Sequence, residues 1–328
     1  MKHIDKNRTA RILDQAQGKT IAVIGDVMLD RYFWGSVSRI SPEAPVPVID
    51  VESETFHLGG AANVAKNLRS LGLEPLLCGI IGDDNSGAMF RQIAESSGIN
   101  TMGLYVDSGR PTTVKTRIIG NNQQIARIDR EVKTQLPKQG LELIKNCLIN
   151  QKELAGVILE DYNKGTLTST LISDIIHFCN EKNIPVFVDP KSDNFFVFKN
   201  VTCFKPNRKE AQQALGIEFD TIENLHVAGI KLLDTLHCDS VLITLGSAGM
   251  MLFESDGTIS SVPTKARHIS DVSGAGDTAI AVIAATYAGG ADIKEAATLS
   301  NNAAGLVCEK PGIVTITIEE LIESIGSL

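Results

Sequence analysis

The stretch "DVSGAGDTAI" (271–280) places three residues with almost no side chain, Gly274, Ala275 and Gly276, directly before Asp277. The residues that follow Asp277 are nearly all apolar or small, which predicts a buried helix that starts near Gly276. The first amides of a helix lack an intrahelical acceptor and carry partial positive charge from the helix dipole. Because small residues leave these amides accessible, the stretch predicts an anion site with a carboxylate beside it.

Asp277 has two interpretations. A carboxylate beside an anion site is repulsive unless it has a chemical role, such as accepting a proton from a hydroxyl that attacks a phosphorus or carbonyl centre. The alternative is structural, with Asp277 as a helix N-cap and the glycines as a turn. The stretch taken alone leaves both open.

The rest of the chain predicts an α/β fold, because short apolar runs alternate with helical patterns along most of its 328 residues. Five predicted strands are apolar on both faces, as in a buried parallel sheet: 20–25, 75–80, 156–160, 185–189 and 241–246. Helices are predicted at 85–97, 138–151, 167–181, 220–236, 276–288 and 292–309. Since the sequence has no internal repeat and no linker, we expect residues 1–328 to form a single domain.

Two segments depart from this alternation, at about 31–57 and 111–131. Both are rich in β-branched residues, and both carry turn signals, Ser41-Pro42 in the first and Gly120-Asn121-Asn122 in the second. We expect them to pair into one small β-sheet, a lid over the open edge of the core. Exposed edges of the lid strands indicate a homodimer that pairs lid to lid.

The charge balance excludes several classes of protein. With 31 basic and 39 acidic residues the net charge is −8, which argues against nucleic-acid binding. The six cysteines lie far apart without metal-ligand spacing, so we expect reduced thiols and a cytoplasmic protein. The N-terminus lacks the apolar core of a signal peptide, and the longest apolar run, 279–285, is too short to cross a membrane. No GxGxxG follows the strand at 20–25, which excludes a dinucleotide oxidoreductase.

A second glycine pair opens another predicted helix in "HLGGAANVAKNLRSLG" (57–72). Gly59 and Gly60 precede an apolar helical face, and Asn63 and Asn67 lie off that face, one turn apart. Polar amides at a glycine-opened helix start suit a polyhydroxylated ligand. The alternative is an ordinary amphipathic helix with exposed asparagines.

These two stretches resemble the two signatures of the ribokinase-like (PfkB) family of sugar kinases. Between them, "KPNRKEA" (205–211) resembles the family's Asn-x-x-Glu element and "ITLGSAGM" (243–250) its nucleotide loop. The resemblance covers about residues 18–316. It implies a ribokinase-like fold, a doubly wound, mostly parallel sheet flanked by helices with a small β-sheet lid, and an ATP-dependent phosphotransferase with an alcohol group as acceptor.

Three further stretches resemble a subgroup of the family: "GDVMLDRYFWGSVSRISPEAPVPV" (25–48), "NNQQIARID" (121–129) and "VDPK" (188–191). That subgroup phosphorylates the anomeric O1 of D-glycero-β-D-manno-heptose 7-phosphate to the 1,7-bisphosphate, in ADP-heptose and lipopolysaccharide core synthesis. Bifunctional relatives continue into a nucleotidyltransferase domain, so an end at Leu328 leads us to expect the stand-alone kinase form. The alternatives are another sugar kinase of the family, acting on ribose, fructose or fructose 6-phosphate, and a non-catalytic sugar-phosphate-binding regulator.

The resemblance also implies roles for individual residues. Asp277 is expected to be the general base, with the amides of Gly274, Ala275 and Gly276 holding the phosphoryl group. Sugar hydroxyls are expected on Asp30, with Gly59, Gly60 and Asn63 in the same pocket. Nucleotide contacts are expected from Asn207, Thr244, Gly246 and Asn301, Mg²⁺ near Asn207 and Glu210 through water, and a monovalent cation such as K⁺ near Asp271 and Ser273.

The phosphate already on the substrate needs a local cationic site in an acidic protein. Lys115 and Arg117 are two apart on a predicted lid strand and so point to one face, and Arg127 follows. The alternative for these three is a solvated, charged strand edge. Lys191 is a further candidate for an anionic group of the nucleotide or the sugar. Asp26 is a weaker candidate than Asp30, because an Asp directly after a strand is often a turn residue.

Overall fold

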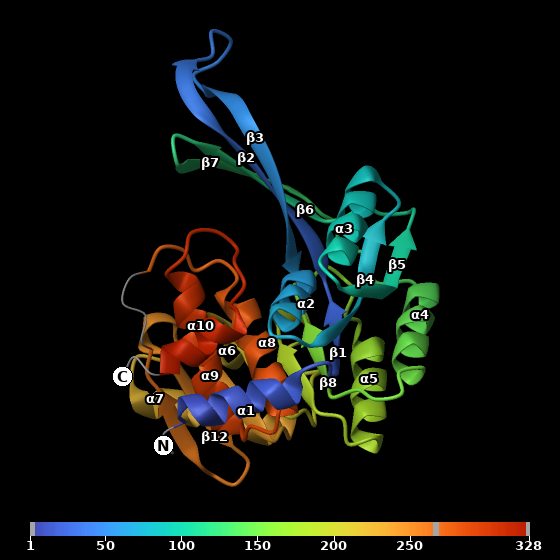
Figure 1. Cartoon of the computed structure of the whole chain (residues 1–328), viewed down its shortest axis with the longest axis vertical. Coiled ribbons are helices and arrows are strands. Elements are labelled where there is room, and N and C mark those ends of the chain that lie inside the picture. The colour runs from blue at the N-terminus through green and yellow to red at the C-terminus, as the bar shows by residue number, and fades with distance from the viewer. Residues whose placement is uncertain (1–3, 265–268, 326–328) are drawn as a thin grey trace.

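A computed structural model describes residues 4–264 and 269–325 (Figure 1). Within these residues the main sheet has nine strands in the order β13-β12-β11-β10-β9-β8-β1-β4-β5. Their bounds are β1 Thr20–Gly25, β4 Glu74–Gly82, β5 Asn100–Asp107, β8 Gly156–Glu160, β9 Val186–Asp189, β10 Cys203–Phe204, β11 Ser240–Thr244, β12 Met250–Glu254 and β13 Ile259–Val262. The pairs from β5 through to β11 are parallel, and β12 and β13 add antiparallel strands at one edge.

The five predicted strands are confirmed, with one correction at the end of the last. The strand predicted to reach Gly246 stops at Thr244. Gly246 instead begins the 3₁₀ turn η2 (Gly246–Ala248), where its φ of 61° is in the left-handed region that favours glycine. The amide of Leu245 donates to the carbonyl of Gly249, which closes the turn into β12.

Helices cover both faces of the main sheet, as the doubly wound prediction required. One face carries α1 Lys6–Ala16, α2 Ala61–Ser70, α3 Asn85–Ser96, α8 Ala275–Ala288, α9 Ile293–Cys308 and α10 Ile318–Ile325. The other carries α4 Lys138–Ile149, α5 Ser169–Glu181, α6 Arg208–Leu215 and α7 Ile222–Leu236, with the short turn η1 Ser192–Asn194 before α6. No helix in the described ranges is long and apolar enough to span a bilayer. All six cysteines are free thiols.

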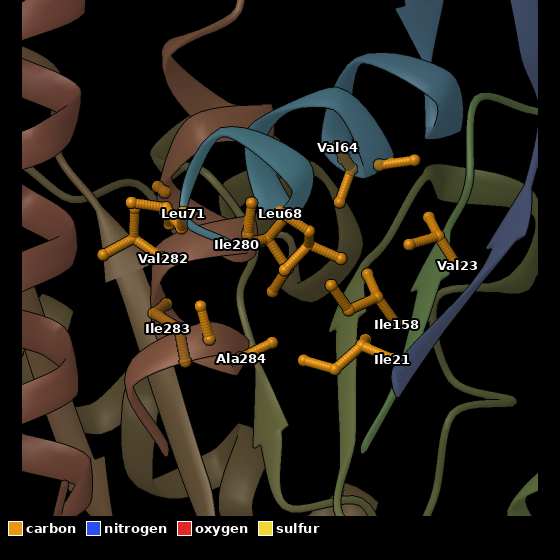
Figure 2. Close-up of a cluster of buried hydrophobic side chains, with 14 of the residues drawn as sticks. Ile21, Val23, Val64, Leu68, Leu71, Ile158, Ile280, Val282, Ile283 and Ala284 are labelled. Atoms are coloured by element: carbon orange, nitrogen blue, oxygen red, sulfur yellow. The ribbon is translucent and has the colours of Figure 1, made fainter. Parts of the chain in front are cut away.

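Helix α8 is buried along most of its length. Figure 2 shows Ile280 and Ile283 of α8 packed with Leu68 of α2 against Ile21 and Ile158 of the sheet. Burial of each such side chain stabilises the fold by roughly 1.5–3 kcal/mol relative to exposure. This packing fixes the position of the helix, and with it the position of the residues at its start.

The two segments outside the βα pattern do form one small sheet, which projects from the main body (Figure 1). Over the described residues its order is β3-β2-β6-β7, with bounds β2 Val27–Ile40, β3 Pro47–Gly60, β6 Val114–Gly120 and β7 Gln123–Arg130. Asn121 and Asn122 both have positive φ and form the two-residue turn between β6 and β7, as that hairpin geometry requires.

The first segment of the small sheet extends beyond its predicted bounds, and its strands β2 and β3 join the core without a loop. Strands β6 and β7 are instead connected to the core through residues 108–113 and 131–137. Asp26 alone separates β1 from β2, and β3 runs directly into α2. Asp26 is buried, and its carboxylate accepts the amides of Tyr162, Lys164 and Thr166 at 2.8–3.0 Å. The role of Asp26 at this joint is therefore structural, as expected for an Asp that directly follows a strand.

Candidate active site

Polar residues gather where the carboxyl ends of the central strands meet the start of α8. In parallel α/β sheets this end of the strands is where ligands bind. Glu160 ends β8, Asp189 ends β9 opposite it in register, and Lys205 follows β10. A Cβ on Gly276 would lie 3.6 Å from an Asp189 carboxylate oxygen, so the start of α8 is directly beside these groups.

The N-cap of α8 is Gly274, with a φ of 79° that favours glycine. Among the described residues, no carbonyl or side chain accepts the amides of Gly274 and Gly276. The amide of Ala275 lies 3.3 Å from the carbonyl of Val272, a long hydrogen bond. Two of the three predicted anion-binding amides are therefore available to a ligand, and the third is partly engaged within the loop.

Asp277 does not cap the helix, so its structural interpretation does not hold. Its side chain is buried, and both carboxylate oxygens accept hydrogen bonds from distant parts of the chain. Asn63 Nδ2 donates to Oδ2 at 2.7 Å, and the Tyr162 hydroxyl donates to Oδ1 at 2.8 Å. Burial raises the pKa of Asp277 to about 6, while the hydrogen bonds from Asn63 and Tyr162 act to lower it. A carboxylate poised near neutral pH can accept a proton from a hydroxyl.

Helix α2 brings its two asparagines inward rather than exposing them. Asn63 and Asn67 are both buried, and Asn67 joins the helices by accepting the Thr278 hydroxyl at 3.1 Å. Asn63 Oδ1 is buried without a partner among the described residues. It can therefore accept a hydrogen bond from a ligand hydroxyl next to Asp277.

Asp30 lies inside strand β2, five residues after the end of β1. It is buried and forms an ion pair with Arg117 of β6. A Cβ on Gly59 would lie 2.1 Å from Asp30 Oδ2, so only glycine leaves room for this carboxylate. The structure thus brings Asp30, Gly59 and Arg117 together. Asp30, predicted to accept sugar hydroxyls, is paired with Arg117, which was predicted to bind the phosphate already on the substrate.

The other two predicted cations of the small sheet differ in their surroundings. Lys115 is partly buried beside Tyr162, and burial lowers its pKa against the opposing charge of Asp30. Arg127 is paired in register with Arg117, but its guanidinium is about half exposed and binds both oxygens of Asp129 at 3.0 Å. The environment of Arg127 is that of a solvated strand edge.

Thr244, Gly246 and Asn301 line one pocket of about 170 Å³, together with Ala275 and Gly276 of the α8 start. Its walls are mainly apolar and include Met250, Ile269, Val272, Ala279 and Ala304. An apolar pocket that ends at free helix amides can hold a flat ring and direct an attached anion toward those amides.

Asn207 and Glu210 form a complete capping box at the start of α6. Asn207 Oδ1 accepts the Glu210 amide at 2.9 Å, and Glu210 Oε2 accepts the Asn207 amide at 2.8 Å. The other Glu210 oxygen pairs with Lys191. Asp271, in contrast, accepts the amides of Ser273 and Gly312, which lower its pKa against the effect of burial and keep a negative charge before the α8 loop.

The model of the family described as pfkB family carbohydrate kinase matches residues 19–320. The chain belongs to this family. It is a phosphotransferase that uses an alcohol group as acceptor. The kinase is 44% identical over 302 residues to the protein named Bifunctional protein HldE of Desulfatibacillum aliphaticivorans. That alignment covers 92% of this chain and 62% of the relative, so the chain spans less than two thirds of the relative's length.

Solved structures confirm the ribokinase-like fold of the kinase. Arabidopsis thaliana ribokinase, complexed with ribose and ATP, gives a TM-score of 0.74 at 18% identity, over 94% of this chain and 99% of that chain. Escherichia coli phosphofructokinase-2, in complex with potassium, gives a TM-score of 0.77 at 14% identity, over 94% and 98%. At such identities the likeness concerns the fold.

Four residues of the kinase's cleft escaped the sequence analysis: Glu160, Tyr162, Asp189 and Lys205. Lys205 Nζ lies 2.7 Å from Asp189 Oδ2, with both side chains buried. Burial, with the charges of Asp189 and Asp277, raises the pKa of Glu160 well above its usual range, and Glu160 Oε2 is buried without a partner in the described ranges. The available signal was their position at or just after the ends of apolar strands, in "LEDYNK" (159–164), "VDPK" and "FKPN".

Proposed function

We propose that this kinase transfers the γ-phosphoryl group of ATP to the anomeric O1 of D-glycero-β-D-manno-heptose 7-phosphate, giving the 1,7-bisphosphate. The observation that supports phosphoryl transfer most directly is the buried Asp277 carboxylate beside the amides of Gly274 and Gly276, which have no acceptor within residues 4–264 and 269–325. The choice of sugar is supported by the subgroup-like stretches at 25–48 and 121–129 and by the similarity to a protein named HldE.

In the proposed reaction, Asp277 accepts the proton of O1 as O1 attacks the γ-phosphorus. The bond from the γ-phosphorus to the β–γ bridging oxygen breaks, and that oxygen leaves with ADP. The amides of Gly274 and Gly276 hold the charge that spreads over the other phosphoryl oxygens. Asp30 and Asn63 orient the sugar by accepting its hydroxyls, and they thereby place O1 against Asp277.

The pocket lined by Thr244, Gly246 and Asn301 is the proposed site of the adenine end of ATP. Mg²⁺ fits the capping box of Asn207 and Glu210 only through water, because both side chains already accept backbone amides. When bound there, it neutralises phosphate charge. Asp271 and Ser273 are the residues that would hold K⁺, since the Asp271 carboxylate stays ionised.

The proposal is tested by measuring ATP consumption by the purified protein against heptose 7-phosphate, fructose 6-phosphate, ribose and fructose. We expect kcat/KM to be highest for heptose 7-phosphate. Preference for another member of the panel would assign the chain to a different sugar of the same family. Sugar-phosphate binding without ATP consumption on any member would favour the non-catalytic regulator.

Arg117→Ala is expected to raise the KM for the sugar phosphate by roughly 10–100-fold and to leave the KM for ATP nearly unchanged. Arg117 holds Asp30, the proposed acceptor of sugar hydroxyls, through a charged hydrogen bond, so its loss should mainly weaken sugar binding. Arg31 pairs with Glu54 in the same small sheet, and Arg31→Ala is the matched control. Equal rises in both KM values would contradict a role specific to the sugar phosphate.

We also propose that the protein forms a homodimer through the small sheet. Large apolar side chains are exposed along its strands and first turn: Trp34, Ile40, Val46, Val51, Ile125 and Ile128. Such a patch favours association. Sedimentation velocity is expected to show a dimer that Val51→Lys with Ile128→Lys converts to a monomer. A wild-type monomer at all concentrations would contradict the proposal.

A further inference from the structure

Tyr162 contacts Asp277, the joint between the two sheets, and one lysine each from the small sheet and from the loop after β9. It follows β8 by two residues, and its amide is fixed at 2.8 Å by the buried Asp26 carboxylate at the joint between the sheets. Its hydroxyl donates to Asp277 Oδ1 at 2.8 Å. Over its ring lie Lys115 Nζ from the small sheet, 5.4 Å from the ring centroid, and Lys191 Nζ from the loop after β9, at 5.3 Å.

These contacts leave the Tyr162 side chain little freedom. Cation–π contacts hold the ring from two different parts of the fold. The hydroxyl is thereby aimed at a single carboxylate oxygen, while Asn63 holds the other oxygen at 2.7 Å. Two donors from separate elements set the plane of the Asp277 carboxylate. Each oxygen keeps a second lone pair, so the carboxylate can still accept a proton.

We propose that Tyr162 is a positioning residue that orients the Asp277 carboxylate for proton transfer. The proposal rests on Asp277 being the general base of the proposed function. Tyr162 itself is no base, since burial, together with the charges of Asp277 and Glu160, raises its pKa well above the usual range. It remains a donor throughout.

The hydrogen bond from Tyr162 also affects the charge state of Asp277. A donor stabilises the carboxylate and lowers its pKa, in opposition to burial. The other charged groups that act on Asp277 are Asp189, which raises its pKa, and Lys205, which lowers it; buried Glu160 also lies close by. Removal of the Tyr162 hydroxyl alone leaves Asp189, Lys205 and Glu160 in place.

Tyr162→Phe tests the inference by removing that hydroxyl and keeping the ring that the two lysines contact. We expect kcat at pH 7 to fall roughly 10–100-fold, the worth of a hydrogen bond to a charged group, with both KM values nearly unchanged. The acid limb of kcat/KM, which in the wild type reports the Asp277 pKa of about 6, is expected to move to higher pH. The difference in activity between Tyr162→Phe and the wild type should therefore shrink as the pH is raised.

A second readout does not depend on turnover. In protein labelled with ¹³C at aspartate carboxyls, the Asp277 resonance is assigned by its absence from Asp277→Asn. Its titration midpoint should be higher in Tyr162→Phe than in the wild type. Tyr105→Phe, the same loss of a hydroxyl in β5, is the matched control and should change neither kcat nor the titration.

An unchanged kcat and an unshifted midpoint in a folded Tyr162→Phe protein would overturn the inference. A lower kcat with an unshifted midpoint would also overturn it, because loss of packing alone would then account for the effect. Failure of the proposed function gives a different pattern. In that case Asp277→Asn would keep its turnover. The titration midpoint of Asp277 would still differ between the wild type and Tyr162→Phe, because the hydrogen bond from Tyr162 would still be present.

Discussion

Asp277→Asn is expected to lower kcat by roughly 10²–10⁴-fold, the usual contribution of a general base. Asparagine has the same shape and can keep both contacts, with its amide oxygen toward Asn63 and its amide nitrogen toward the Tyr162 oxygen. Sugar binding should therefore be retained. The measurements are single-turnover phosphoryl transfer, for the rate, and calorimetry, for the affinity.

The same substitution should stabilise the fold at neutral pH. The pKa of Asp277 is about 6 in the folded chain against an ordinary 3.8, so folding is weakened as the pH rises between these values. At pH 7 the buried charge costs on the order of 3 kcal/mol, which a neutral amide removes. We expect a higher melting temperature together with the lower kcat.

Asp174→Asn on α5 makes the same chemical change in a partly exposed ion pair with Lys145, and it serves as the control for both effects. Its kcat and its melting temperature should stay close to those of the wild type. Near-normal ATP turnover by Asp277→Asn would contradict the assignment of Asp277 as the base.

Lys205→Met is expected to lower the free energy of unfolding at pH 7 by about 3–5 kcal/mol, the effect of leaving a buried charge unpaired. Lys205 and Asp189 are buried together at 2.7 Å, and Asp277 lies close enough for its charge to interact with both. Methionine fills similar space but leaves these acids without their buried cation. The measurement is urea unfolding at several pH values.

The loss should shrink as the pH falls, because protonation of Asp277, whose pKa is about 6, removes part of the uncompensated charge. Adding Asp189→Asn to Lys205→Met should recover most of the stability, since the pair is then replaced by neutral groups. Lys145→Met, which removes the cation of the exposed pair on α4, is the control and should change little. Equal unfolding of Lys205→Met and the wild type would show that the pair contributes nothing.

Much of the fold was predictable because its signals are local. A strand buried on both faces must be apolar throughout, so "TIAVIG" and "GVILE" were placed correctly from composition alone. The small sheet was found because its residues depart from that pattern. The loop at 274–276 was predicted because accessible helix amides require small residues, and Gly274, Ala275 and Gly276 are visible as such in the sequence.

The residues that were missed act through tertiary contacts. Nothing near Tyr162 in the sequence indicates that its hydroxyl meets a carboxylate 115 positions away. In the sequence Lys205 is indistinguishable from a surface lysine, because its contact with Asp189 depends on the pairing of β9 with β10. Arg117 was identified as a cation, but its pairing with Asp30 depends on the register of β2 against β6. The sequence pattern therefore indicates which residue types are present, but their contact partners depend on how the strands pair.

The joint between the two sheets limits how the small sheet can respond to a substrate. Strands β2 and β3 are connected to the core without a loop, because only the hydrogen-bonded Asp26 lies between β1 and β2 and no residue lies between β3 and α2. Displacement of β2 and β3 relative to the core must therefore come from bending along their own length. Asp30 and Gly59, which we propose to contact the sugar, lie at the attached end of these strands, so they should move least and the far turn of the hairpin most.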